Sequence, residues 1–524
     1  MTGTYPIGEE HQGDPHRWAI AFAVVLASVI QVIDTSIVNV AIPHMMGTLG
    51  ATIDEIAWVS TGYMLAAVIV IPLTGWLAAF FGRKRYFVAS ILIFTAASFF
   101  CGASHSLAAL IFWRVVQGIG GGALVSTSQA IMYQAFPRDE TAKAMAMWGV
   151  GIMVGPTLGP TLGGWITDNY SWPWIFYINL PIGILATAMV VAYVHDHPEH
   201  ARSRTIDAIG IGLLAVSVGS AQWVVEHGQR EEWFTSRTVV TLTVTGLVTW
   251  ALLVWRELTI ADPVVDFRIL RHRQVWAGTL IGVVVGVGLF GSVFVLPIHL
   301  QSILRMNAWQ TGLIILPGAI ATAFSMGVVG RIGRRVDPRV LITIGGLLFV
   351  AGMGMLSRMT AASGRDDFFW PLIWRGLGLG LVFVPLTNLT LADLSHTELP
   401  HATGLSNFFR QLGGSFGIAA MASLLTRFTA QARQAILVGI PAYGPVTSER
   451  LTALTRGFMA RGADAWTAKQ RALMVIDAQA GVQASVIAFS KVYLLSAAIL
   501  LASLPLLLVL RPGHGPTGPS IAAE

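Results

Sequence analysis

Residues 17–41 read RWAIAFAVVLASVIQVIDTSIVNVA, a long apolar run that contains a single acid, Asp34. A helix needs about 20 mostly apolar residues to cross a bilayer, so this run is long enough to span one. It is too long for the apolar core of a signal peptide, and residues 1–16 before it carry acids as well as histidines. We therefore expect a retained first span that follows a cytoplasmic N-terminal tail, residues 1–16.

Similar apolar runs recur along the whole chain. The sequence is 54% hydrophobic and only 11% charged, whereas soluble domains carry about 25% charged residues, so lipid is the expected solvent for much of the surface. Backbone that faces lipid must be hydrogen-bonded internally, and the alternation typical of barrel strands is missing, so each run is predicted to be a helix. The fourteen predicted spans are 17–41, 55–79, 86–104, 107–135, 142–166, 174–194, 206–226, 238–256, 275–301, 309–332, 339–358, 370–393, 403–429 and 484–510.

The basic residues indicate the orientation. The formal net charge is +6, but Lys and Arg gather in short clusters between apolar runs and form no continuous stripe for nucleic acid. Clusters such as Arg83-Lys84-Arg85 alternate with loops that hold few basic residues, and the positive-inside rule then predicts that both termini are cytoplasmic. The single cysteine, Cys101, excludes a disulfide within the chain and is expected to be a small buried hydrophobe.

A weak internal repeat divides the predicted spans. Gly75-Trp76-Leu77 has a counterpart in Gly330-Arg331-Ile332, and Trp113-Arg114 has one in Trp374-Arg375. Parallel six-helix halves of this kind place the substrate site between them, near the middle of the membrane. We predict an N-terminal six-helix bundle over 17–194, two inserted transmembrane helices with their loops over 195–256, a C-terminal six-helix bundle over 257–510 and a cytoplasmic tail over 511–524.

Residues 430–483 are the only sizeable segment expected outside the membrane, as an extracytoplasmic loop. Gly and Pro punctuate its first part, and we expect helix from Ser448 onward, with Thr467 as the cap of an amphipathic run. The sequence leaves two roles open for the segment: an ordered surface cap or a docking site for an external partner.

Ionisable residues inside a span are candidate functional residues, because a charge costs about 3 kcal/mol or more at the bilayer centre. Asp34 lies deep in the first span. A carboxylate in a cavity of low dielectric can exchange protons near neutral pH, or attract a cationic substrate. The alternative is a structural carboxylate that an arginine neutralises. Asn39 lies in the same string and is included with Asp34 among the candidates for proton coupling or substrate binding.

Three arginines lie in the other predicted spans. Arg114, one turn before Gln117, cannot lose its charge and so cannot carry the proton, but it can control the charge state of a carboxylate as helices shift. A fixed ion pair is the alternative. Arg375 is its counterpart in the second half and is expected nearer a membrane face, where it would snorkel. Arg410, between Phe409 and a glycine-rich stretch, is expected to pair with an acid or bind an anionic group, unless it only packs.

The fifth predicted span has small residues at a spacing of four, namely Gly151, Gly155-Pro156, Gly159-Pro160 and Gly163-Gly164. Small residues at this spacing make a smooth helix face, and the prolines kink the helix and free backbone carbonyls. We expect this face to rock against a neighbouring helix; a tight static interface is the alternative.

Metal, nucleotide and enzyme chemistry have no basis in the sequence. His195, His197 and His200 have a loose metal-like spacing, but without Cys or carboxylate support a solvated loop is expected. There is no P-loop, no HExxH motif and no nucleophile–base constellation, and no large sensor domain that a receptor would need. We expect no metal, no cofactor other than a proton gradient, and a secondary active transporter in place of an enzyme.

Together these strings resemble the EmrB/QacA-type drug:proton antiporters, the fourteen-span branch of the major facilitator superfamily, over nearly the whole chain. Asp34 to Pro43 is similar to the family's first-span signature, and 151–164 to its antiporter motif. Gly75, Gly82, Arg83 and Lys84 resemble the loop motif between spans two and three, although Ala79 replaces a common Asp. Arg114, Gln117 and Gly118 resemble the span-four motif that the family links to proton coupling. The strings 168–183 and 407–417 resemble the EmrB branch in particular.

The resemblance implies a multi-pass transporter of the cell inner membrane that exports amphipathic or hydrophobic toxic compounds by alternating access, driven by proton influx. It also implies a periplasmic adaptor protein and an outer-membrane channel as partners in a tripartite efflux pump. Asp34 would be the proton or cation site and Arg114 its coupling partner. The alternatives are an exporter of a specific metabolite or fatty acid, and a nutrient symporter, against which the span-five pattern argues.

Overall fold

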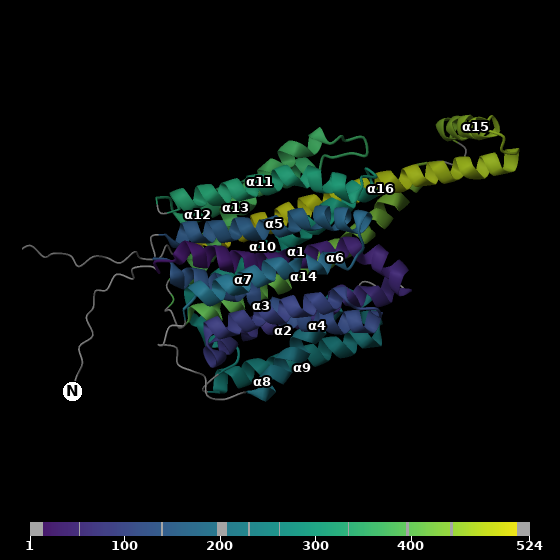
Figure 1. Ribbon diagram of the computed structural model, residues 1–524. Coiled ribbons are helices and arrows are strands. Elements are labelled where there is room, and N and C mark those ends of the chain that lie inside the picture. The colour runs from purple at the N-terminus through teal and green to yellow at the C-terminus, as the bar shows by residue number, and fades with distance from the viewer. Residues whose placement is uncertain are drawn as a thin grey trace, which may run out of the picture.

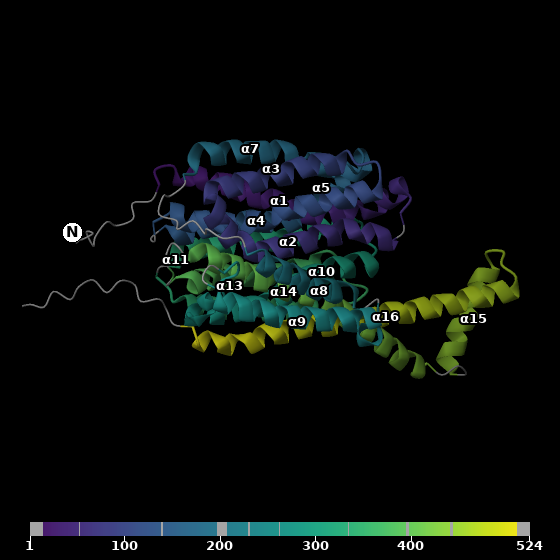
Figure 2. The ribbon, with the colours of Figure 1, turned by 90° about the horizontal axis from the view of Figure 1, so that it is seen from below.

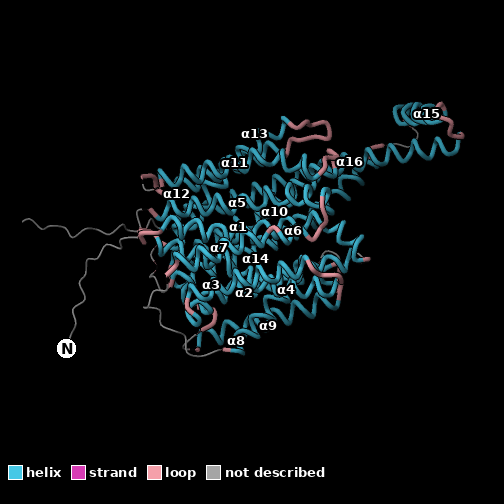
Figure 3. The backbone as a smooth tube through the Cα atoms, in the orientation of Figure 1, coloured by secondary structure: helices cyan, strands magenta, loops and turns pink. Residues whose placement is uncertain are grey.

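The computed structural model describes residues 14–51, 53–137, 140–195, 207–228, 231–260, 263–333, 335–392, 394, 398–440 and 444–510. All regular structure within these residues is helical, as the tube in Figure 3 shows. Most of the helices lie side by side along one common direction (Figures 1 and 2). The predicted all-α polytopic architecture is therefore confirmed.

Helices occupy all the positions at which spans were predicted. In chain order they are α1 (Arg17–Leu49), α2 (Ile53–Phe81), α3 (Arg83–Gly102), α4 (Leu107–Ala135), α5 (Thr141–Asn169), α6 (Trp174–Tyr177), α7 (Asn179–Tyr193), α8 (Ala208–His227), α9 (Arg237–Thr259), α10 (Arg273–Ser302), α11 (Ala308–Ile332), α12 (Pro338–Leu356), α13 (Phe369–Leu391), α14 (Leu399–Val438), α15 (Pro445–Met459) and α16 (Ala465–Ser503), with short 3-10 turns that include η4 (Leu504–Leu508). Within the described part of the chain, 11 helices are long and apolar enough to cross a membrane.

Two groups of helices make up the bundle. Helices α1 to α7 pack against one another, and so do α10 to α14 together with α16. The two groups meet where α5 lies along α11 and where α2 lies along α14. The pair α8 and α9 stands outside both groups, with α8 packed against α2 and α14. The widest contact between the groups therefore involves α5, the helix that carries the repeated glycines.

Glycines allow the closest helix contacts. A Cβ on Gly122 of α4 would lie 2.6 Å from the carbonyl oxygen of Ala67 on α2. In the second group, a Cβ on Gly378 of α13 would lie 2.5 Å from the carbonyl oxygen of Gly345 on α12. Any larger side chain would push these helices apart, because such contacts are shorter than van der Waals distance.

The segment predicted as a loop over 430–483 is mostly helix. Helices α14 and α16 continue beyond the bundle and carry α15 at its far end (Figures 1 and 2). Thr467 is not a cap, because α16 begins earlier: the side chain of Asp464 accepts hydrogen bonds from the backbone of Trp466 and Thr467. Helix also begins at Pro445, three residues before the predicted start at Ser448.

The predicted span 174–194 is interrupted at Ile178, between α6 and α7. Pro181 has no backbone N–H, so it cannot donate to the carbonyl of Tyr177 one turn earlier. The break places Asn179 at the start of α7, with 1% of its surface exposed. This break in the helix therefore places the side-chain amide of Asn179 inside the first group of helices.

Candidate functional site

Asp34 and Arg114 form a fully buried ion pair inside the first group of helices. Asp34 is 0% exposed and Arg114 is 1% exposed. The Nη1 of Arg114 lies 2.6 Å from the Oδ2 of Asp34, so α1 and α4 are joined by a charge-assisted hydrogen bond, which is stronger than a neutral one. The sequence predicted each residue as a candidate, and the structure brings the two together.

Two amides complete the coordination of the Asp34 carboxylate. Gln117 Nε2 donates to Oδ1 at 3.0 Å, and Asn179 Nδ2 donates to the same oxygen at 2.9 Å. Gln117 also accepts from Arg114 Nη1 at 2.7 Å. The carboxylate therefore accepts three hydrogen bonds, from α4 and α7, and no water is needed to satisfy its main acceptors.

Arg114 also makes a backbone hydrogen bond and two aromatic contacts. Its Nε donates to the backbone carbonyl of Val59 on α2 at 3.0 Å. Its guanidinium lies over the ring of Tyr63, 4.3 Å from the centroid, and 5.7 Å from that of Phe176. Aromatic faces attract cations, especially where water is excluded. The pair thus connects α1, α2, α4 and the α6–α7 break in one polar cluster.

Asn179 and Ser98 are members of this cluster that sequence reasoning did not select as site residues. Asn179 donates to the Oγ of Ser98 on α3 at 3.0 Å, and Ser98 donates to the carbonyl oxygen of Phe176 at 2.8 Å. Neither residue is ionisable, so a search for charges inside spans passes over both. The one clue in the sequence is Pro181, which marks a helix break next to Asn179.

The glycine face of α5 packs on α1, the helix that carries Asp34. A Cβ on Gly155 would lie 2.5 Å from Val32 Cγ1, and one on Gly159 would lie 2.6 Å from the Oγ of Ser36. Gly151 and Gly163 meet Val25 and Ile37 in the same way, at 2.5 and 2.7 Å. The face therefore runs along α1 on both sides of Asp34, within one group of helices and not between the two groups. Gly164 continues α5, and the side chains of Pro156 and Pro160 lie outside the described part.

Other residues of α5 reach the second group. A Cβ on Gly149 would lie 2.8 Å from the sulfur of Met326 on α11. Trp148 is fully buried, and its ring is parallel to that of Phe383 on α13, with centroids 6.3 Å apart. A displacement of α5 would therefore act directly on α11 and α13.

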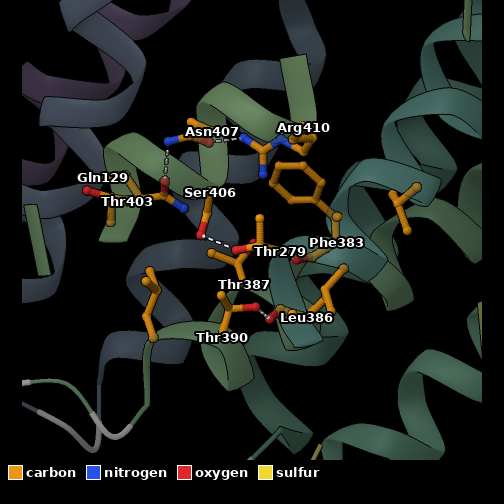
Figure 4. Close-up of a pocket in the computed structure, with 14 residues that line it drawn as sticks. Gln129, Thr279, Phe383, Leu386, Thr387, Thr390, Thr403, Ser406, Asn407 and Arg410 are labelled. Carbon is orange, nitrogen blue, oxygen red and sulfur yellow. Dashed lines mark hydrogen bonds between the residues drawn. The ribbon is translucent and has the colours of Figure 1, made fainter. Parts of the chain in front are cut away.

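A small polar cavity lies against this second group (Figure 4). Arg410, Asn407 and Ser406 of α14 contribute to it, with Thr279 of α10 and Phe383 of α13. Its free volume is about 30 Å³, enough for a few water molecules, whereas pockets for drug-sized ligands measure about 300–1,000 Å³. The described conformation thus holds a constricted cavity near the contact between the two groups.

Asn407 connects the cavity to the first group of helices. Its Nδ2 donates to Gln129 Oε1 at 2.9 Å and to Ser126 Oγ at 3.2 Å, both on α4. Its carbonyl oxygen accepts a hydrogen bond from Arg410. The Arg410 guanidinium lies 4.8 Å from the centroid of Phe383. Arg410 therefore has an amide and an aromatic face as partners, and no carboxylate among the described residues pairs with it.

The loop motif lies at the contact between α2 and α14. A Cβ on Gly75 would lie 2.8 Å from Nδ1 of His401. Gly82 has φ +88, a conformation that favours glycine, and it is the residue before α3. Arg83 is 9% exposed, and Lys84 Nζ donates to the carbonyl of Val191 at 2.8 Å. The motif therefore fixes the end of α2 against α14.

Three sets of candidates remain: Arg375, Asn39, and the histidines considered for metal binding. Arg375 is 6% exposed, so the predicted snorkelling is wrong: the side chain turns into the bundle. The side chains of Asn39, His197 and His200 lie outside the described part. Among the described residues, no group of three or more His, Cys, Asp or Glu side chains is arranged to hold a metal.

Comparisons with known proteins show the family to which this chain belongs. The sequence profile of the Major Facilitator Superfamily matches residues 24–418. Multidrug export protein EmrB of Escherichia coli K12 is 33% identical over 502 residues, covering 95% of this chain and 96% of EmrB. Fatty acid resistance protein FarB of Neisseria gonorrhoeae is 30% identical over 494 residues, covering 94% of this chain and 96% of FarB.

A solved structure shares the fold. The human organic anion transporter MFSD10 (TETRAN) superposes with a TM-score of 0.59 at 14% identity, covering 93% of this chain and 100% of that chain. At this identity the likeness concerns the fold alone. With the matched profile and the full-length similarity to EmrB, it shows that the chain belongs to the Major Facilitator Superfamily, in the branch of the EmrB-type multidrug exporters.

Proposed function

We propose that this protein is a multidrug exporter of the cell inner membrane that couples the efflux of amphipathic or hydrophobic compounds to the entry of protons. The observation that carries the coupling is the Asp34 carboxylate, which is fully buried yet bound only through hydrogen bonds that protonation would weaken. The similarity to EmrB over nearly the full length supports export. The protein would act as a secondary transporter, without a cofactor or a chemical reaction.

Protonation of Asp34 would release α1 from α4. The bond from Arg114 to Asp34 depends on the negative charge of the carboxylate, and removing one partner of a buried pair costs about 3–5 kcal/mol. Because the glycine face of α5 follows α1 closely, a shift of α1 would move α5, which contacts α11 along the second group. This path would convert a proton on Asp34 into movement between the two groups of helices.

The cavity beside Arg410 is the proposed substrate site. It lies between helices of the second group, and Asn407, which lines it, is hydrogen-bonded to Gln129 of α4. Its small volume in the described conformation requires an opening movement before a drug can enter, as alternating access demands. Arg410 and the hydroxyl groups of Thr279 and Ser406 would orient a polar group of the substrate, while Phe383 would face its apolar part.

A second candidate is export of a fatty acid or another amphiphilic carboxylate. Arg410 has no carboxylate partner among the described residues. The Nε2 atom of Gln129 is buried and has no hydrogen-bond partner. Both groups are donors that line the same cavity. A carboxylate would satisfy them, and the name of the relative FarB points to the same chemistry.

The membrane topology is proposed to consist of fourteen spans with both termini in the cytoplasm. Helices α5, α10 and α14 would cross with the 11 apolar helices. Figure 2 supports an even number, because α1 begins and η4 ends at the same end of the bundle. Two six-helix bundles, 17–194 and 257–510, would move as rigid bodies, with the helices of 195–256 inserted between them.

The projecting helices are proposed to bind a periplasmic adaptor protein, which would connect the transporter to an outer-membrane channel. Helix α15 has no buried residue, and Trp466 at the start of α16 is 73% exposed. Arg433 of α14 pairs with Asp477 of α16 at 2.6 Å, so the two projecting helices are joined and present a fixed surface. A long exposed helical surface with apolar side chains fits a protein partner.

Transport in inverted membrane vesicles tests the proposed function. With an imposed pH gradient, wild type should accumulate an exported dye, Asp34→Asn should not, and Asp34→Glu should retain part of the activity. Counterflow of dye without a gradient should survive in Asp34→Asn, because that exchange needs no proton. The control is Asp366→Asn, which changes an exposed acid. Gradient-driven accumulation by Asp34→Asn at the wild-type rate would refute the assignment.

A further inference from the structure

A second buried cation lies in the second group of helices and is unlike Arg114 in its surroundings. Arg375 of α13 is 6% exposed, and its Nε and Nη1 atoms have no hydrogen-bond partner. Tyr493 of α16, which is 1% exposed, is the titratable group whose ionised form would act on this charge. A buried polar group without a partner costs free energy, and a buried charge costs more. Some further group is therefore needed to compensate this guanidinium.

His299 of α10 extends the cluster. It is 1% exposed, its Nδ1 lies 3.0 Å from the hydroxyl of Tyr493, and its Nε2 has no partner. When the Tyr493 hydroxyl donates to Nδ1, the proton of the neutral imidazole is on Nε2, which is then a donor. The three unpartnered atoms of the cluster are in that case all donors. A set of donors without an acceptor is suited to an anion.

Among the described residues of the second group, no buried carboxylate is available to Arg375, since Asp366 and Asp367, just before α13, are exposed. Helices α10, α11, α12, α13 and α14 contain no Asp or Glu, and the single acid of α16, Asp477, is on the projecting part and 53% exposed at its side chain. In the first group, the equivalent arginine in the repeat, Arg114, has the carboxylate of Asp34 at 2.6 Å. One half of the molecule thus carries its own counter-ion and the other does not.

The surroundings restrict the ligand to a small ion. The His299 ring is stacked on Phe489 with centroids 4.6 Å apart, and Phe368 approaches edge-on at 5.8 Å. Leu372 and Phe368 are 0% exposed beside them. Arg375 is six residues from the start of α13 and His299 three from the end of α10, about 5–9 Å of helix. A small ion could reach this depth from water, whereas an amphiphilic substrate could not fit without unpacking the aromatic wall.

We propose that Arg375, His299 and Tyr493 form a binding site for a small monovalent anion such as chloride. The bound anion would compensate the charge of Arg375, as the Asp34 carboxylate compensates the charge of Arg114 in the first group of helices. It would stabilise the packing of α10, α13 and α16. The site is separate from the cavity at Arg410 and does not depend on the identity of the exported compound.

Thermal unfolding of the purified full-length transporter in a neutral detergent tests the proposal without a transport assay. Sodium gluconate is replaced by sodium chloride at constant ionic strength and pH. For the wild type we expect the midpoint of unfolding to rise by about 1–2 °C per tenfold increase in chloride above its Kd. A wild-type midpoint that does not differ between chloride and gluconate overturns the proposal, and this outcome requires no variant.

Variants then locate the site. Arg375→Gln should lose the chloride-dependent shift, and Arg375→Lys should keep part of it, because the charge remains while the planar donor geometry is lost. The matched control is Arg358→Gln, an exposed arginine just after α12, which should show the full shift. A full shift in Arg375→Gln places the anion elsewhere and refutes the assignment. A shift produced by anionic lipid and insensitive to chloride would identify a headgroup as the ligand and also refute it.

Discussion

Asn407 of α14 donates a hydrogen bond to Gln129 of α4 across 2.9 Å, and its carbonyl oxygen accepts one from Arg410. One amide therefore joins the two groups of helices and orients the cation of the cavity at the same time. Replacing this amide by a carboxylate would place a negative charge beside Arg410 and would also remove the donor to Gln129.

Asn407→Asp should reduce the export of anionic compounds. The new carboxylate would lie within hydrogen-bonding distance of Arg410 and neutralise it, as Asp34 neutralises Arg114. We expect a loss of about tenfold or more in the transport of a carboxylate substrate, with less effect on an uncharged one. Asn407→Ser, which is also small and polar but uncharged, is the control. Equal loss for both substrates would contradict the role of the charge.

Arg114→Lys should fail to replace arginine. The guanidinium uses Nε for Val59 and Nη1 for Asp34 and Gln117 while its face covers Tyr63. A lysine ammonium has a single nitrogen and cannot reach these groups together. Proton-coupled transport should fall by about tenfold or more while the protein remains folded, which vesicle uptake and thermal unfolding would show. Transport at the wild-type rate would mean that the geometry of the pair is not needed.

Gly155→Ala should destabilise the contact between α1 and α5. The new Cβ would lie 2.5 Å from Val32 Cγ1 and 2.9 Å from the backbone carbonyl carbon of Val32. Overpacking of this kind costs about 1–3 kcal/mol. The double variant Gly155→Ala with Val32→Ala removes the clash with Cγ1, although not the one with Cβ at 2.8 Å, and should recover part of the unfolding temperature and of transport. If the double variant is worse than the sum of the single ones, the two residues do not share a tight contact.

The sequence predicted the positions of the long apolar helices well because apolar length and the absence of charges are sufficient for that purpose. It also selected Asp34 and Arg114, since charges inside spans are rare. It was wrong about Arg375, because position along a helix does not show which face points inward. Asn179 was missed as a site residue because an uncharged amide does not stand out, and its place depends on the break at Ile178.

The sequence also did not show which helix packs on the glycine face of α5. The spacing from Gly151 to Gly163 predicts a smooth surface but does not say which helix it meets. Only the three-dimensional arrangement shows that α1 covers it, with Val25 and Ile37 at its two ends. The same limit applies to Asn407, whose contact with Gln129 joins residues that are 278 positions apart in the chain.

The start of α16 should be sensitive to acid. Hydrogen bonds from the Thr467 side chain and from the backbone of Thr467 and Trp466 lower the pKa of Asp464. Because the folded form has the lower pKa, the stabilising effect of this cap is complete above the unfolded value, about 3.9, and is lost as the pH falls through the folded value. Hydrogen exchange of the first turn of α16 should accelerate in that range. Asp464→Asn, which still accepts hydrogen bonds, should remove the pH dependence without abolishing the cap.

Trp466→Ala should weaken binding of the proposed adaptor protein while leaving transport across the inner membrane intact. Trp466 is 73% exposed at the start of α16, the helix that projects beyond the bundle (Figure 1). Large exposed aromatic side chains often contribute 2 kcal/mol or more to an interface, about a 30-fold loss of affinity when removed. Binding of the purified adaptor should fall, and dye accumulation in inverted vesicles should not change. The control is Lys469→Ala on the same exposed stretch, since losing a peripheral charge should alter affinity little. Unchanged adaptor binding by Trp466→Ala would show that this end of the projection is not the docking surface.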